Sequence, residues 1–127
     1  MLWSHEIELA ADPVSAGRAR HFVDLHLVEH QLRYLVEDVR LVASEFATNA
    51  ALHARTPFTV GLGSTDRSVL LAVRDGAVAT PVTVAADLLA IGGRGLHIVD
   101  RVSTTWGVVT GDGSKSVWAA FDLGASG

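Results

Sequence analysis

The chain has 127 residues, of which 49% are hydrophobic and 19% are charged, which predicts a single globular domain over residues 1–127. Its net charge of −4 argues against direct binding to nucleic acid, and the absence of cysteine excludes disulfides and thiolate chemistry. No apolar run approaches the roughly 20 residues that span a bilayer, and residues 1–13 lack the basic and apolar regions of a signal peptide, so we expect a cytoplasmic protein.

The first half of the chain predicts one strand followed by two helices. Apolar and polar residues partly alternate over residues 3–9, which is typical of a strand. Asp12 before Pro13 is a helix-start signal, because the carboxylate caps N–H groups and proline loses nothing in a first turn. Apolar residues at helical spacing then predict a helix over about 13–30 and a second one over about 35–54, which stops before a proline.

The second half of the chain predicts four strands and a further helix. The elements are, in order, strands over 58–64 and 68–75 joined as a hairpin, a loop over 76–92 with a short helix at 85–90, a helix opened by Gly92-Gly93-Arg94-Gly95, and strands over about 104–110 and 115–123. This order predicts an α/β fold. We expect a two-layer sandwich of a mixed, mostly antiparallel sheet with about three helices on one face.

Glu45, Asn49 and His53 are spaced four apart on the second predicted helix, so their side chains project from one face. An amide oxygen suits Mg²⁺, which prefers oxygen ligands and shares its coordination with phosphates and water. A carboxylate one turn away is placed to accept a proton from an attacking hydroxyl or water. Considered alone, the same three residues are also typical of a solvated helix face.

Asp75 ends an apolar row on the strand over 68–75, where Val69, Leu71 and Val73 lie on the same side. A buried carboxylate needs polar partners, and an ionised one only accepts hydrogen bonds. Asp75 is therefore suited to receive the exocyclic amine of adenine in a mostly apolar pocket. A strand-end aspartate that caps the turn at Gly76 fits the pattern equally well.

Several glycines stand directly before the third predicted helix, at Gly92, Gly93 and Gly95. Glycine allows backbone N–H groups to approach a phosphate closely, and the helix N-terminus adds a favourable field. Arg94 would add positive charge there. An ordinary glycine-containing loop before a helix is the competing interpretation.

Two other patterns suggest different chemistry. The segment His26–His30 (HLVEH) matches the H-x-x-E-H pattern of zinc proteases, but no glutamate follows Glu45 to complete the usual ligand set. This segment is therefore predicted to be part of an amphipathic helix that packs. The segment GDGSKS over 111–116 differs from a phosphate-binding loop because Ser114 replaces the glycine before lysine, and a β-turn is predicted instead.

Taken together, these segments resemble the histidine-kinase-like ATPase superfamily, and more closely the bacterial anti-sigma-factor serine/threonine kinases. The resemblance covers about residues 3–123 in the order of the family. It rests on E-x-x-x-N at Glu45 and Asn49, the aspartate–glycine box at Asp75-Gly76, the second glycine box at Gly93-Arg94-Gly95-Leu96, and the closing strand KSVWAAFDL.

The resemblance implies a Bergerat-type ATP-binding fold with ATP and Mg²⁺ as ligands. It makes Glu45 the general base, Asn49 the magnesium ligand and Asp75 the residue that recognises adenine. The other residues expected to bind the nucleotide are His53, Ala77, Gly93, Arg94, Gly95 and Leu96. Ala77 and Ala79 stand where the family usually has glycine, and the segment between Ala77 and Gly92 is short for an ATP lid.

By the same resemblance, we expect a kinase that phosphorylates a serine of an antagonist protein and sequesters a sigma factor, in the regulation of bacterial transcription. The alternative is a non-catalytic ATP-sensing module whose nucleotide controls the choice of partner, and a detached ATPase is a third reading. The related kinases dimerise. The opening strand, with Trp3, Ile7 and Leu9, is expected at a sheet edge, so we also expect a homodimer.

Overall fold

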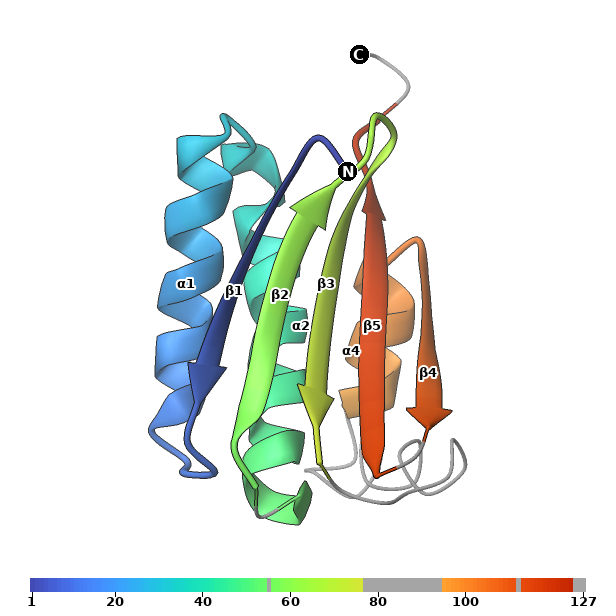
Figure 1. Ribbon diagram of the computed structural model, residues 1–127. Helices are drawn as coiled ribbons and strands as arrows, with labels where there is room; N and C mark the ends of the chain where they lie inside the picture. The colour runs from blue at the N-terminus through green and yellow to red at the C-terminus, as the bar shows by residue number, and fades with distance from the viewer. Residues whose placement is uncertain (55, 77–94, 112, 125–127) are drawn as a thin grey trace.

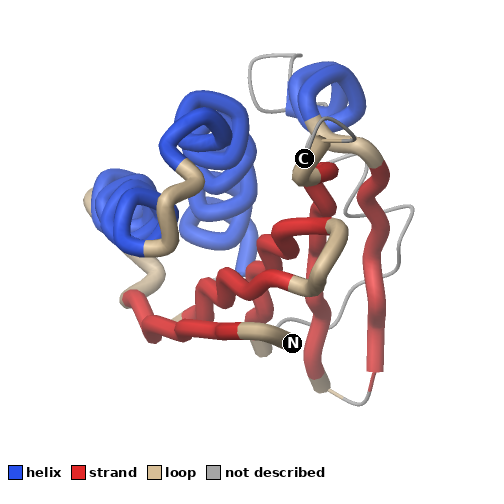
Figure 2. Tube along the Cα trace, turned by 90° about the horizontal axis from the view of Figure 1, so that it is seen from above, coloured by secondary structure: helices blue, strands red, loops and turns tan. Residues whose placement is uncertain are grey.

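The computed structural model describes residues 1–54, 56–76, 95–111 and 113–124, and Figure 1 shows how they are arranged. Within these residues, five strands form one sheet and the α-helices lie on one of its faces, which confirms the predicted α/β sandwich. Figure 2 shows the two layers from above. The elements are, in chain order, β1 (Trp3–Leu9), α1 (Ser15–Glu29), a 3₁₀ turn (Arg33–Leu35), α2 (Val36–Asn49), a π-helical turn (Ala50–Ala54), β2 (Phe58–Ser64), β3 (Ser68–Asp75), α4 (Gly95–Val102), β4 (Thr105–Gly111) and β5 (Ser114–Asp122).

The strand order in the sheet is β1-β2-β3-β5-β4, so β5 lies between β3 and β4. All four pairings among the described strands are antiparallel, and the sheet that we expected to be mixed is antiparallel throughout these residues. The β2–β3 hairpin forms where the sequence predicts it. The short helix predicted at 85–90 lies outside the described residues.

Helix α1 begins two residues after the predicted start at Pro13, and Asp12 is not its N-cap, because Val14 takes that position. The carboxylate of Asp12 accepts a hydrogen bond from the backbone N–H of Val14 at 2.9 Å, and the helix proper starts at Ser15. Its apolar stripe is buried as predicted, including Phe22 and Leu27. Helix α1 packs against α2 and β1 and so forms one side of the helix layer.

Helix α2 is shorter than the single helix predicted over 35–54. A 3₁₀ turn leads into it, and after Asn49 the chain continues as a π-helical turn over Ala50–Ala54. The residue before a proline is disfavoured in the α conformation, so the helix cannot continue through Thr56-Pro57, and helices often change their pitch at such ends. The apolar stripe of α2 is buried as predicted and contacts β3 and β5.

The elements that carry the expected nucleotide residues converge at one end of the molecule. Figure 1 shows that α2 and β3 end at the lower end, where β5 and α4 begin. We call this the nucleotide end. The opposite end holds the start of β1 and the end of α1. No helix in the described part of the chain is long and apolar enough to cross a bilayer.

The pairing of β3 with β5 places a lysine beside the buried aspartate at the nucleotide end. Asp75 lies opposite Lys115 in the register, and the lysine Nζ is 3.4 Å from Oδ2 of the aspartate. The two residues are only 5% and 3% exposed, respectively. Removing one partner of a charged pair this deep in the protein is destabilising, because the remaining charge stays buried without that partner's opposite charge.

Lys115→Met removes the positive charge beside the Asp75 carboxylate while keeping a long side chain. We expect the free energy of unfolding to fall by up to about 3–5 kcal/mol, because removing one partner of a buried ion pair is destabilising. Urea titration followed by circular dichroism measures the change.

The double variant Asp75→Asn/Lys115→Met carries neither charge and should recover most of the lost stability. Arg74→Met is the control, since Arg74 is exposed on the same strand and its loss should change stability by less than about 0.5 kcal/mol. Wild-type stability of the Lys115→Met protein would show that the ion pair does not support the fold.

Candidate functional site

Glu45 and Asn49 lie one turn apart near the end of α2, as the sequence predicts. Asn49 is 1% exposed, and its amide Oδ1 has no hydrogen-bond partner among the described residues. A buried acceptor without a partner costs about 1–3 kcal/mol, so such atoms are rare in folded proteins. The oxygen is therefore suited to a ligand that is not part of the protein.

Glu45 occupies a different environment from Asn49, although both belong to the same helix. Its side chain is partly buried, and burial raises the pKa of its carboxyl group above the ordinary value. Desolvation disfavours the charged form, so this carboxylate holds a proton more readily than an exposed one. A carboxylate with a raised pKa is a better proton acceptor at neutral pH than an ordinary glutamate.

Asp75 ends the buried row of β3, as predicted, and it pairs with Lys115, a buried residue that the sequence interpretation missed. Lys115 takes an inward position on β5, where every second residue is buried. A lysine in such an alternating row is a signal that a buried anion lies nearby. The alternating pattern of β5 does not by itself show which strand carries that anion.

Thr56 also contributes to the nucleotide end. Its Oγ1 accepts a hydrogen bond from the backbone N–H of Gly76 at 3.2 Å. The turn that follows Asp75 is thus held by the segment that leaves the π-helical turn. This bond links the end of the helix to the end of β3, and both α2 and the π-helical turn contact β3.

Of the remaining predicted residues, some have a described backbone and the others lie outside the described residues. Gly95 and Leu96 form the first turn of α4, which starts at the nucleotide end. The backbone of His53 lies in the π-helical turn. Ala77, Gly93 and Arg94 lie outside the described residues, as do the side chains of His53 and Leu96. The structure thus brings together the elements that carry Glu45, Asn49 and Asp75, and describes the phosphate segment only from Gly95 onward.

Comparison with known proteins agrees with this arrangement. The profile of the histidine kinase-like ATPase domain matches residues 9–121, which include all the elements of the nucleotide end. No curated protein shows a significant match to the chain. Because the profile covers most of the chain, the protein belongs to the histidine kinase-like ATPase domain family and is an ATP-binding domain of that kind.

Proposed function

We propose that this ATP-binding domain is a serine/threonine protein kinase of the anti-sigma-factor type, which phosphorylates an antagonist protein and sequesters a sigma factor. The observation that carries the proposal is the pair on α2. A partly buried glutamate with a raised pKa lies one turn before an asparagine whose buried Oδ1 has no partner among the described residues. The first group suits proton transfer and the second suits metal binding.

Asn49 is the proposed ligand of Mg²⁺. Its amide oxygen is the type of donor that Mg²⁺ prefers, and its lack of a protein partner in the described residues leaves that oxygen to an ion. When bound with ATP, Mg²⁺ supplies positive charge that offsets the charge of the phosphates. Gly93, Arg94, Gly95 and Leu96 are proposed to contact those phosphates, with His53 and Ala77 nearby.

Glu45 is the proposed general base. As the serine oxygen of the antagonist forms its bond to the γ-phosphorus, Glu45 accepts the hydroxyl proton. The bond from the γ-phosphorus to the β–γ bridging oxygen breaks, and ADP leaves with that electron pair. Phosphoserine, ADP and protonated Glu45 are the products, and the proton then passes to solvent.

Asp75 is the proposed adenine-recognition residue. Its burial beside Lys115 holds the carboxylate at the end of an apolar row. An ionised carboxylate accepts the two N–H groups of an amine but cannot donate to a carbonyl. Adenine carries an amine where guanine carries a carbonyl, so this group favours ATP over GTP.

The alternative function is an ATP-sensing switch that changes partners without phosphoryl transfer. Two sequence features favour it: Ala77 and Ala79 replace glycines that are usual in the family, and the segment between Ala77 and Gly92 is short for a lid. A short lid would leave the nucleotide less enclosed, and water exclusion matters more for transfer than for binding.

Asp75→Asn should lower the affinity for ATP roughly 10- to 150-fold, because losing a hydrogen bond to a charged group costs about 1.5–3 kcal/mol. Affinity for GTP should fall much less, so the preference for ATP is the informative readout. Isothermal titration calorimetry with both nucleotides measures it. The Asp75→Asn/Lys115→Met variant is the control, since it lacks the carboxylate without leaving a buried lysine unmatched. If that variant keeps the wild-type preference for ATP, Asp75 does not recognise the base.

Glu45→Ala should retain ATP and lose phosphorylation of the antagonist, because a general base contributes roughly 10²–10⁴-fold to rate and little to ground-state binding. Asn49→Ala should instead lose the magnesium-dependent part of ATP binding while the fold is kept. Phosphoserine formation with labelled ATP, beside ATP affinity with and without Mg²⁺, separates the two roles.

Glu37→Ala is the matched control for this pair, because it removes an exposed carboxylate from the first turn of α2. It should behave as wild type in both assays. If the wild-type protein transfers phosphate to no antagonist protein encoded near it, the kinase is excluded and the switch is retained. Wild-type magnesium-dependent affinity in Asn49→Ala would remove Asn49 as the ligand.

We also propose that the protein forms a homodimer. β1 lies at an edge of the sheet, as predicted, and an edge strand offers its outer backbone groups to a second chain. Trp3, Ile7 and Leu9 pack toward the core, so these side chains do not form the contact surface themselves. Light scattering at high concentration should give twice the mass of one chain. A monomer both with and without ATP would contradict this.

A further inference from the structure

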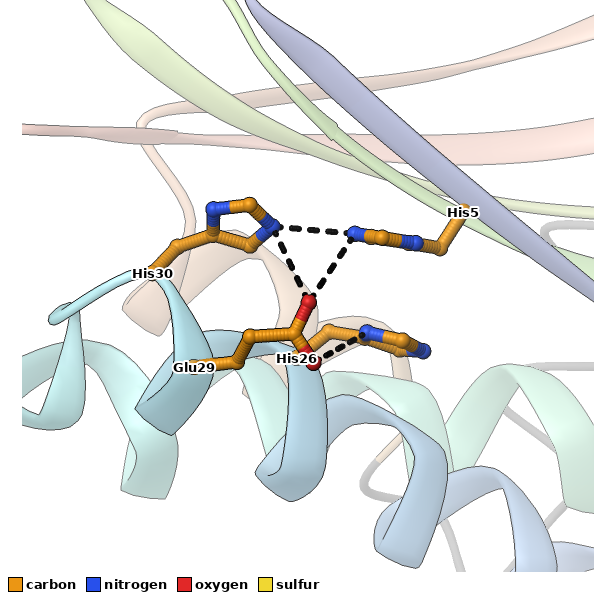
Figure 3. Close-up of polar contacts among 4 residues, drawn as sticks. All are labelled: His5, His26, Glu29 and His30. Atoms are coloured by element: carbon orange, nitrogen blue, oxygen red, sulfur yellow. Dashed lines mark hydrogen bonds and ion pairs between the residues drawn. The ribbon is translucent and has the colours of Figure 1, made fainter.

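Three histidines and one glutamate converge at the end of the molecule opposite to the nucleotide end (Figure 3). His5 comes from β1, whereas His26, Glu29 and His30 come from the last turn of α1 and the residue after it. We call these four residues the histidine cluster. None of them belongs to the proposed nucleotide site, so that site does not explain why they lie together.

The ligand atoms of His5, Glu29 and His30 form a triangle, drawn with dashed lines in Figure 3. The two histidine Nε2 atoms are 2.9 Å apart, and Oε1 of Glu29 lies 3.7 Å from that of His5 and 3.6 Å from that of His30. Ligand atoms on a tetrahedral zinc ion with bonds of about 2.0–2.1 Å are about 3.3–3.4 Å from one another. The three observed separations bracket this value, so one ion fits all three atoms after small shifts.

The rings of the cluster are held in place by stacking. The Trp3 ring is parallel to that of His30 at a centroid distance of 3.9 Å, and the His26 ring lies 3.8 Å from that of His5. Without a metal ion, one Nε2 of the His5–His30 pair donates a hydrogen bond and the other accepts it. Both nitrogens therefore already point at a shared position between them, and a metal ion takes the place of one proton.

His26 has a supporting role in this arrangement. Its Nδ1 is buried, makes no hydrogen bond within the described part of the chain, and lies 3.5 Å from Oε2 of Glu29. One ligand atom each of His5, His26 and Glu29 also lies within 4.8 Å of the others. The His26 ring thus lies beside the second oxygen of Glu29, where it would limit the orientations open to the carboxylate.

We propose that His5, Glu29 and His30 bind one Zn²⁺ ion, with His26 as a positioning residue. Two imidazole nitrogens and a carboxylate oxygen are a ligand set that zinc accepts in proteins. An ion can enter from solvent, because the side chains of the cluster are between 16% and 47% exposed. The His26–His30 segment supplies Glu29 and His30 as ligands, and the fold adds His5 from β1.

The ion would join the edge strand to the helix layer. His5 and His30 are 25 residues apart and belong to different layers, so one ion bound to both closes a loop that includes all of α1. A ligand that binds only the folded state stabilises that state. We therefore expect a site that supports the fold and leaves ATP affinity unchanged.

The test uses the full chain without a histidine tag, after treatment with a chelator. Titration with Zn²⁺ by calorimetry should show one ion per chain, and Co²⁺ should give the visible absorption of a tetrahedral ion. His5→Ala and His30→Ala should each lower the zinc affinity by at least about 100-fold, more than the roughly 10- to 100-fold expected of His26→Ala as a positioning change. His26→Ala should also keep the shape of the Co²⁺ spectrum. His21→Ala, an exposed histidine on the same helix, is the control and should bind as wild type.

Two results would overturn the proposal. One is the absence of saturable Zn²⁺ binding by the wild-type chain, and the other is equal affinity in His5→Ala and His21→Ala. Circular dichroism checks that each variant folds. Glu29→Gln provides a second route, because it keeps the shape of the side chain and should still lower the affinity and remove the thermal stabilisation by Zn²⁺. ATP titration of each variant keeps this test separate from the proposed kinase function.

Discussion

The packing of α2 against the sheet is the constraint on which the rest of the nucleotide end depends. Val39, Val42 and Phe46 are fully buried on the face that meets β3 and β5. Burying a large apolar side chain contributes about 1.5–3 kcal/mol, so this stripe fixes the rotation of the helix about its axis. Once that rotation is set, residues one turn apart must project in a common direction. The positions of Glu45 and Asn49 therefore follow from the packing of the helix.

The same packing explains why polar groups at the nucleotide end are buried. Asn49, Asp75 and Lys115 are all at most 5% exposed, although the surrounding core is apolar. Buried polar groups are costly unless they are paired. Asp75 is paired with Lys115, whereas the asparagine oxygen has no hydrogen-bond partner among the described residues. Buried polar groups of this kind gather where proteins bind substrates, because the fold is stable enough elsewhere to tolerate them.

The histidine cluster at the opposite end joins an edge strand to a helix. β1 is an edge strand, with a neighbouring strand on one side only within the described sheet, and α1 packs across it. Stacked rings and a shared carboxylate join this strand to the helix, and a bound ion would strengthen the same connection. The histidine cluster and the residues expected to bind the nucleotide therefore lie at opposite ends of the sandwich. Changes at one end need not disturb the other.

Local patterns in the sequence were sufficient for much of this protein. Alternation predicted the strands, the aspartate–proline pair predicted the start of α1 to within two residues, and four-residue spacing placed Glu45 and Asn49 on one helix face. These features depend only on the geometry of one helix or one strand, so they can be read along the chain. The Lys115 partner of Asp75 and the approach of His5 to His30 could not be read in this way. Each joins residues far apart in the chain. The first contact depends on which strand lies beside β3 and in what register, and the second depends on how α1 crosses β1. Strand order and register are set by the packing of the whole core, because a shift of one residue would turn every buried side chain toward solvent.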